Sequence, residues 1–523
     1  MTFSTKMKAA ALALAIAVAG TSFMKPAAAA VPGISGVANS TGTGQIFNLS
    51  ASADLISQPD GAMIYSWGYG CSSGSPTPGF LPSGTGSIPG ANCPLMQLPG
   101  PTLIVTEGQT VTVNLSNNLP VAAGNPSIVF EGFPLCAVTP ATAATATTAA
   151  VPAACAVTAT GGVAGLLTQE AVHGTTVTYS FTADKPGTYA YHSGSQADLQ
   201  VEMGLYGALI VLPKTPASCT SNNSGTNYSL ASSAYDHPGT CYDREYLFQF
   251  SEMNSTIHQQ AEAQAGGPGP ILVTTEPYHP NYFLINGRSM PDDMDGPYSP
   301  AYAHQPYNGN PHMHPGELML MRVIGQGRWQ HPFHFHGNHA RVLANDGNLL
   351  LALSDAAQPL ANQHLAGPLK FTIGTVSGQT VDAIFTWTGQ GLNWDVYGLT
   401  NPHTCNGKAL STTPGDPAVQ SAGFDPVTHE YCLDHGKPIP VTPPDPQIVA
   451  NGLWYGGTPY LGLQAANLTP LPPGQIRQNF DAGYAYMWHS HNEREITTSD
   501  VFPGGMMMMM IIDPPTSPID ETL

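Results

Sequence analysis

Three pairs of histidines separated by one residue are the feature of this sequence best suited to chemistry. The pairs are His312 with His314, His334 with His336, and His489 with His491. On a β-strand, residues i and i+2 point to the same face, so each pair can present two imidazoles to one metal. Imidazole binds copper, zinc, iron and nickel. Three such pairs among 18 histidines are hard to attribute to chance, and they predict a bound transition metal.

The segments around these histidines have the alternating apolar and polar pattern of β-strands. In the first half of the chain the pattern covers residues 101–120, 176–194 and 203–213. In the second half it covers residues 314–327, 331–347, 379–389, 482–491 and 504–513. Each half has an entry pair of strands, a late strand that ends in Tyr or Trp before His, and an apolar closing strand. This order predicts an all-β protein with a duplicated Greek-key β-sandwich.

The composition supports short strands joined by turns, because the chain contains 56 Gly and 49 Pro and only 9% charged residues. We expect a signal segment at 1–30, a first β-sandwich at 31–215, a linker at 216–240, a second β-sandwich at 241–515 and a tail at 516–523. The Met506–Met510 run resembles a soft-metal site, but we interpret it as a buried strand, since thioethers pack well in cores.

The first thirty residues have the pattern of a secretory signal, with Lys6 and Lys8 before the apolar run 9–20 and four alanines before Val31. The apolar run is shorter than the ~20 residues that span a bilayer. We therefore expect an exported chain that lies in the periplasm, at the cell surface or outside the cell. Removal of three lysines with the signal changes the formal charge from −19 to −22. Such a charge argues against nucleic acid and anionic membranes as partners.

The eight cysteines fall into four pairs that follow one another along the sequence: Cys71 and Cys93, Cys136 and Cys155, Cys219 and Cys241, Cys405 and Cys432. Local disulfides in an oxidising compartment are the simplest interpretation, although the sequence leaves the connectivity open. No cysteine has the spacing to a histidine motif that would make it a metal ligand.

Three motifs resemble those of the multicopper oxidases. HPFHFHG from His331 resembles the third copper motif of the family, HPxHLHG, and WHSHNEREITTSDVFPGGM from Trp488 resembles the fourth, HCHxxxH with its Gly-Met tail. YHSGSQADLQVEMGLYGALIV from Tyr191 resembles the second. The resemblance implies tandem cupredoxin-like domains with a mononuclear type 1 copper, and a trinuclear type 2 and type 3 cluster that reduces dioxygen to water.

The resemblance also implies a set of copper ligands. His334 occupies the type 2 position, His336, His489, His491 and His192 occupy type 3 positions, and His331 occupies a type 1 position. The match is incomplete. Ser490 replaces the type 1 cysteine, Glu495 the second type 1 histidine and Gly194 the second histidine of the second motif, and residues 129–132 stand where the first motif is expected.

A type 1 copper needs a thiolate, which serine cannot supply. We therefore expect a site of one or two coppers without a blue centre, built from His334, His336, His489, His491 and His192, and we count His331 as a further candidate metal ligand. His312 and His314 either complete a shifted site or form a polar turn before a strand.

Three interpretations stay open. The first is an atypical copper oxidase acting on dioxygen with a small reductant or a metal ion, and the second is a non-catalytic copper-binding or storage protein. The third is a structural or assembly protein of the cell surface. The resemblance also allows copper between the subunits of a homotrimer or larger oligomer. The sequence contains no GxxxxGK[ST] or HExxH motif, so P-loop and HExxH zinc hydrolase functions have no support.

Overall fold

The structure is a computed structural model that describes residues 31–73, 78–82, 84–133, 158–219, 231–392, 395–397, 403–409, 423–437, 484–513, 515 and 518–519. The predicted signal segment at 1–30 and the cysteines Cys136 and Cys155 lie outside the described residues. The same holds for most of the predicted tail at 516–523.

The first half of the chain forms two six-stranded sheets that enclose one core. One sheet has the order β5 (Gly79–Leu81), β1 (Gly33–Ser35), β6 (Leu103–Thr106), β14 (Tyr206–Leu212), β13 (Gly187–His192), β8 (Val129–Phe130). The other has the order β2 (Val37–Ala38), β3 (Gly44–Ser57), β7 (Thr110–Asn117), β12 (Thr176–Thr182), β9 (Thr158–Thr160), with β4 (Met63–Cys71) paired to β3.

The second half repeats the two-sheet arrangement. Its larger sheet has the order β16 (Tyr282–Ile285), β15 (Arg244–Met253), β18 (Leu318–Gly325), β24 (Thr380–Thr386), β20 (Ala340–Asn345), β21 (Asn348–Leu349), with β22 (Leu369–Lys370) paired to β20. The other has the order β17 (His312–Met313), β28 (Met507–Ile512), β27 (Tyr484–Ser490), β19 (His331–Phe335), β23 (Thr372–Thr375). In the described part of the chain no sheet contains strands from both halves. The predicted all-β class with tandem β-sandwiches is confirmed.

The remaining elements are small. They are the hairpins β10 (Val163–Ala164) with β11 (Gln169–Glu170) and β25 (Thr404–Cys405) with β26 (Lys408–Ala409), and the helices α2 (Ala197–Gln200) and α3 (Ser255–Gln264). The predicted linker at 216–240 falls between β14 and β15, which are the last and first strands of the two halves. The domain limits themselves stay a prediction.

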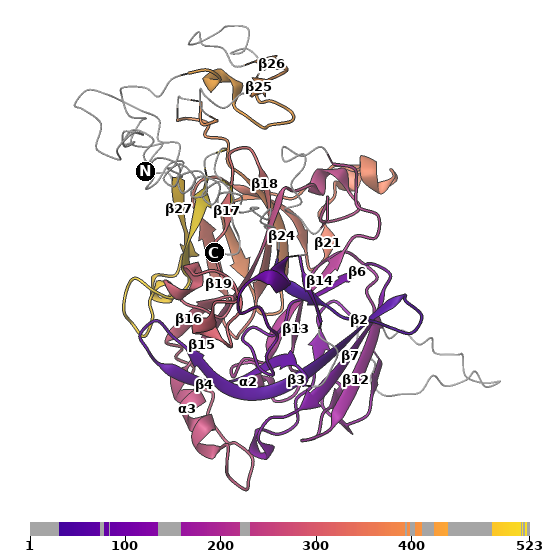
Figure 1. The fold of residues 1–523 in the computed structure, drawn as a ribbon, viewed down its shortest axis with the longest axis vertical. Coiled ribbons are helices and arrows are strands. Elements are labelled where there is room, and N and C mark those ends of the chain that lie inside the picture. The colour runs from indigo at the N-terminus through magenta and orange to yellow at the C-terminus, as the bar shows by residue number, and fades with distance from the viewer. Residues whose placement is uncertain are drawn as a thin grey trace, which may run out of the picture.

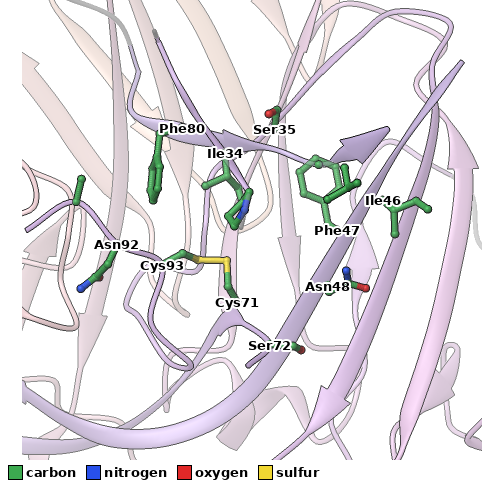
Figure 2. A pocket seen from close by; sticks show the side chains of 14 residues that line it. Ile34, Ser35, Ile46, Phe47, Asn48, Cys71, Ser72, Phe80, Asn92 and Cys93 are labelled. Atoms are coloured by element: carbon green, nitrogen blue, oxygen red, sulfur yellow. A yellow bond between two sulfur atoms is a disulfide. The ribbon is translucent and has the colours of Figure 1, made fainter. Parts of the chain in front are cut away.

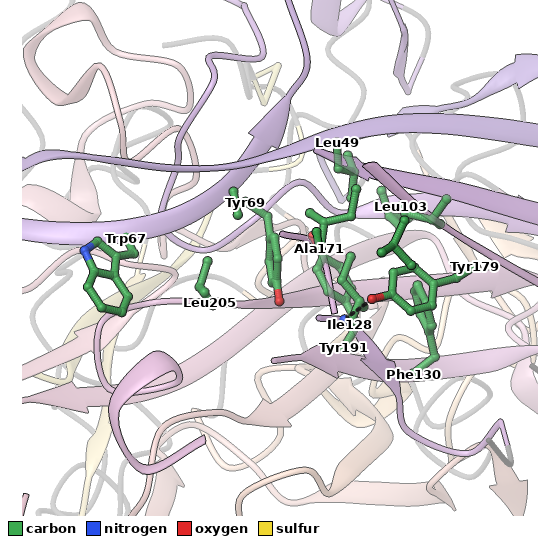
Figure 3. Packing of buried hydrophobic residues seen from close by; sticks show 14 of the residues in the cluster. Leu49, Trp67, Tyr69, Leu103, Ile128, Phe130, Ala171, Tyr179, Tyr191 and Leu205 are labelled. Carbon is green, nitrogen blue, oxygen red and sulfur yellow. Dashed lines mark hydrogen bonds between the residues drawn. The ribbon is translucent and has the colours of Figure 1, made fainter. Parts of the chain in front are cut away.

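The first core is rich in tyrosine side chains whose hydroxyl groups form hydrogen bonds (Figure 3). Tyr69 of β4 donates its hydroxyl hydrogen to the carbonyl of Ser127 at 2.6 Å, and Tyr179 of β12 donates to that of Gln169 at 2.6 Å. Because a buried hydroxyl without a partner is costly, these bonds let large rings pack between the sheets. The alternating burial of β7 shows the period of two that such a half-buried strand requires.

The two halves pack closely against each other. In Figure 1 the indigo-to-magenta strands of the first half lie below the orange-to-yellow strands of the second. Helix α3 of the second half packs beside β4 of the first, where Nδ1 of His258 donates to the Tyr65 carbonyl at 2.6 Å. Between β13 and β24, the Thr188 hydroxyl donates to Asp382 at 2.6 Å, and Arg322 donates to Thr188 at 2.8 Å. These buried polar contacts fix the relative position of the halves.

Three of the four expected disulfides form in the structure: Cys71–Cys93, Cys219–Cys241 and Cys405–Cys432. The Met506–Met510 run is buried except for Met509, which is partly exposed, and it forms most of β28, so the interpretation of a core strand is confirmed. No helix in the described residues is long and apolar enough to cross a membrane.

A cavity of about 310 Å³ lies in the first half beside the Cys71–Cys93 disulfide (Figure 2). Apolar side chains such as Ile34 and Phe80 and the amides of Asn48 and Asn92 line this cavity. Its lining contains no histidine, acid or free thiol. The cavity therefore has no side chain suited to binding a transition metal or to acid–base chemistry.

Candidate metal centre

Two neighbouring strands position the main histidine cluster. Strands β19 and β27 pair antiparallel with His334 directly opposite His489. The alternation of β19 buries Phe333 and Phe335 in the core of the second half, so His334 lies on the other face. His336 follows one residue after β19, and its carbonyl accepts a hydrogen bond from the Trp488 indole at 2.9 Å. The cluster thus combines His334 and His336 of one chain segment with His489 of the paired strand.

The ring nitrogens of His334, His336 and His489 form a compact group. One nitrogen of each lies within 4.8 Å of the others, and Nε2 of His336 is 3.4 Å from Nε2 of His489. Metal–nitrogen bonds of 2.0–2.1 Å at tetrahedral angles place two ligand nitrogens about 3.3 Å apart. The His336–His489 separation therefore matches that of two ligands on one metal.

The cluster keeps its imidazoles neutral. Burial, together with the charges that His336, His489 and His491 would carry, lowers the pKa of His334 to about 4. The pKa values of His336 and His489 are also lowered, chiefly by burial. Since a metal binds the unprotonated nitrogen, lowered pKa values favour metal binding at neutral pH.

Hydrogen bonds to the other ring nitrogen orient two of the three imidazoles. Nδ1 of His489 donates to the carbonyl of Ser490 at 2.7 Å, which leaves the lone pair on Nε2, the nitrogen that faces His336. Nδ1 of His334 lies 2.8 Å from the hydroxyl of Thr372 on β23. Partners of this kind fix the tautomer and the ring plane of metal-binding histidines.

His491 lies at the rim of the cluster. Its ring centroid is 4.8 Å from that of His334, but its side chain is 55% exposed. It is not among the three residues whose ligand atoms converge. His491 is therefore the nearest candidate for a fourth ligand on the solvent side.

The structure does not bring His192 into this group. At the end of β13, Nε2 of His192 donates to Glu131 at 2.7 Å and Nδ1 donates to the carbonyl of Ser193 at 2.9 Å. Burial opposes protonation, yet these two bonds raise the pKa of His192. Both nitrogens act as donors, so neither offers a lone pair while Glu131 stays in contact. A ligand role for His192 stays a prediction.

His331 is fully buried between two carboxylates and lies outside the three-histidine group. Its Nε2 donates to Glu252 at 2.9 Å. Its Nδ1 is 3.0 Å from Oε2 of Glu495, an ion-pair distance without good hydrogen-bond geometry. Burial alone would lower the pKa of His331, but the two carboxylates raise it to about 9. His331 is therefore a positively charged imidazolium at neutral pH. Its predicted role as a metal ligand stays untested.

Oε2 of Glu495, which lies near His331, also accepts a hydrogen bond from the Ser490 hydroxyl at 2.5 Å. Ser490, Glu495 and His331 are the three residues that the sequence comparison placed at type 1 positions, and they do converge. A carboxylate oxygen lies between the hydroxyl and the imidazole. The three side chains therefore meet at one place, but they are linked by a hydrogen bond and an ion-pair contact instead of a thiolate–metal bond.

His312 and His314 do not join the cluster. His312 on β17 pairs with Asp513 at 2.7 Å, and His314 contacts Glu317 at 3.0 Å. Both histidines therefore contact carboxylates outside the cluster.

Sequence reasoning missed Glu131 and Glu252 as partners of the predicted histidines, because each comes from a distant strand or turn. It also missed a second group of possible metal ligands, namely Asp395, His403, Glu430 and His435. The signal was present in the sequence, since an acid or a histidine stands two or three residues from each cysteine of the Cys405–Cys432 pair.

Comparison with known proteins also finds similarity between this chain and multicopper oxidases. Residues 155–216 match a family model described as multicopper oxidase. A multicopper oxidase of Talaromyces pinophilus is 35% identical over 132 residues, which cover 24% of this chain and 18% of that protein. An L-ascorbate oxidase of Brassica rapa subsp. pekinensis is 34% identical over 115 residues, which cover 22% of this chain and 16% of that protein. Each match therefore spans less than a fifth of the relative.

Among solved structures, the multicopper oxidase mgLAC aligns with a TM-score of 0.45 at 17% identity, over 91% of this chain and 87% of that chain. A blue copper oxidase from Nitrosomonas europaea aligns with a TM-score of 0.44 at 17% identity, over 89% of this chain and 85% of that chain.

The matched segment 155–216 contains the second of the three motifs, YHSG with its closing strand β14. These sequence matches and the three motifs show that parts of the chain are similar to multicopper oxidases.

Proposed function

We propose that the chain is an exported copper-binding protein of the multicopper oxidase type. It would be an atypical oxidoreductase in which His334, His336 and His489 hold copper without a blue type 1 centre. The observation that carries the proposal is the convergence of three imidazole nitrogens within 4.8 Å. Copper binds well to neutral imidazole, and the pKa values of all three histidines are lowered.

The donor set fits copper, which supplies one-electron chemistry toward dioxygen when it is bound. The chain contributes orientation through the Nδ1 bond of His489 and access through the half-exposed His491. Dioxygen together with a small reductant or a metal ion fits such an accessible site as substrate. The remaining predicted ligands, His192 and His331, stand outside the proposed site.

Copper binding without turnover is a second candidate, and one observation favours it. The Ser490 hydroxyl bonds to Glu495 where a type 1 copper would need a thiolate, so the chain lacks the sulfur that would pass electrons to the histidine cluster. A storage or buffering role needs no such path.

Copper loading of the full chain tests both candidates. We expect about one or two coppers per chain, a paramagnetic resonance signal, and no intense thiolate absorption band. His336→Gln and His489→Gln should each weaken copper binding by at least about 10-fold. The matched control is His364→Gln, which changes a histidine whose side chain is 84% exposed and paired with Asp355.

Equal copper retention by the wild type and both cluster variants would overturn the proposed site. Oxygen uptake with a phenol or a cuprous or manganous salt then separates the candidates. Uptake that depends on His336 supports the oxidoreductase, and tight copper without uptake supports the binding protein.

A further inference from the structure

Four ligand-type side chains converge in the part of the chain between β24 and β27, away from the histidine cluster described above. They are Asp395, His403, Glu430 and His435, and one donor atom of each lies within 4.8 Å of the others. Three of the four residues are buried, and the side chain of His403 is 9% exposed. The proposed function uses none of them.

The distances between the donor atoms fit one small cation. Nε2 of His403 lies 3.4 Å from Oδ2 of Asp395 and 3.2 Å from Oε1 of Glu430. Nδ1 of His435 lies 3.0 Å from the same Glu430 oxygen and 4.0 Å from the same Asp395 oxygen. Tetrahedral zinc with bonds of 2.0–2.2 Å places its ligand atoms about 3.3 to 3.6 Å apart. The four observed separations bracket that value, so a cation could bind with small side-chain movements.

Contacts around the group orient the ligands toward its centre. Nε2 of His435 donates to the carbonyl of Ala409 at 3.2 Å, which directs the other nitrogen, Nδ1, to the carboxylates. Asp395 accepts hydrogen bonds from the backbone N–H groups of Tyr397 and Gly436 at 3.0 and 2.9 Å. Histidines and carboxylates that bind metals are held by outer partners of this kind.

One polar atom in the group lacks a partner. Oε2 of Glu430 is buried, and within the described residues it accepts no hydrogen bond, although Glu430 is only 2% exposed. Buried carboxylate oxygens normally have partners, because an unsatisfied one is costly. A cation bound by both oxygens of this carboxylate would remove that cost. The observation is independent of the distances between the donors.

The backbone also holds the group in place. His403 and Glu430 each stand two residues before a cysteine of the Cys405–Cys432 disulfide, and His435 stands three residues after Cys432. The disulfide therefore ties together the segments that carry three of the four ligands. Such a closed set of four protein ligands is typical of structural rather than catalytic zinc sites.

We propose that Asp395, His403, Glu430 and His435 form a second metal site, which binds a borderline divalent cation of the Zn²⁺ class and holds these segments together. Two carboxylates and two neutral imidazoles balance the charge of one divalent cation. The alternative is a metal-free network in which protonated imidazoles compensate the carboxylates.

Zinc titration of the full chain tests the site in a background that lacks the first cluster. The double variant His336→Gln/His489→Gln removes the competing ligands, and we expect it to retain about one Zn²⁺ per chain. Adding His435→Gln or Asp395→Asn should remove that zinc, whereas adding His364→Gln should not. Co²⁺ in place of Zn²⁺ should show the intense visible bands of four-coordinate cobalt only when all four ligands are present.

A background variant that binds no Zn²⁺ would overturn the proposal and leave the ion-pair network. Zinc retention by the His435→Gln and Asp395→Asn variants would overturn it as well. If His435→Gln fails to fold, the nearly isosteric Asp395→Asn variant still tests the site. The outcome is independent of copper binding, because the background lacks two of the proposed copper ligands.

Discussion

At the scale of single residues, Glu495 decides what the site around His331 can do. Its Oε2 atom lies 2.5 Å from the Ser490 hydroxyl and 3.0 Å from Nδ1 of His331. The other nitrogen of His331 donates to Glu252. Two buried carboxylates therefore share one imidazolium, and the attraction between these charges replaces the metal bonds that the motif resemblance implies.

This arrangement predicts a pH dependence of stability. The pKa of His331 is raised from 6.5 to about 9 in the folded protein. Its stabilising contribution is therefore fully present below about pH 6.5 and is lost as the pH rises through about 9. The shift corresponds to about 3 kcal/mol. The loss of stability between about pH 6 and about pH 10, measured by urea unfolding, should be about 3 kcal/mol smaller in His331→Gln than in the wild type. An equal pH dependence in both proteins would contradict the prediction.

The same three positions predict how a blue centre could be restored. The double variant Ser490→Cys/Glu495→His would place a thiolate and a second imidazole beside Nδ1 of His331, which is the His₂Cys set of blue copper sites. After copper loading we expect an intense thiolate-to-copper absorption band. Neither single variant should show the band, and adding His331→Gln should abolish it. A colourless, copper-loaded double variant would show that these positions no longer define a copper site.

At the scale of elements, the pairing of β19 with β27 assembles the copper cluster, and β28 supports it from the next position in the sheet. Register places His489 opposite Met507 and Trp488 opposite Met508. Met508 is fully buried in the core of the second half. The methionine run therefore supports the metal-binding strands through packing.

This role of the methionines can be measured. Met508→Ala should lower the free energy of unfolding by about 2–5 kcal/mol through the cavity that it creates, and Met508→Leu should cost less than about 1.5 kcal/mol. Both variants should retain the copper of the wild type, because the thioether is not a ligand. Loss of copper in a folded Met508→Leu protein would instead make the sulfur part of the site.

At the scale of the whole molecule, the first half contributes packing more than metal ligands. His192 is paired with Glu131, and Gly194 and residues 129–132 offer no imidazole. The copper ligands we propose all come from the second half. The polar contacts between Thr188, Arg322 and Asp382 fix one half on the other. Assembly into a homotrimer, which would add ligands from a neighbouring subunit, stays a prediction.

The sequence by itself determined the strand-rich class, the two-part organisation and the His-x-His pairs on strands, and it indicated local disulfides without determining their connectivity. Each of these depends on local pattern, such as the alternation in β7 or the His-x-His spacing at His334. Only the tertiary structure decided which imidazoles share a site, because that depends on strand register and on side chains that meet from far apart in sequence. It placed His334 opposite His489, paired His192 with Glu131, enclosed His331 between Glu252 and Glu495, and gathered Asp395 and His403 with Glu430 and His435.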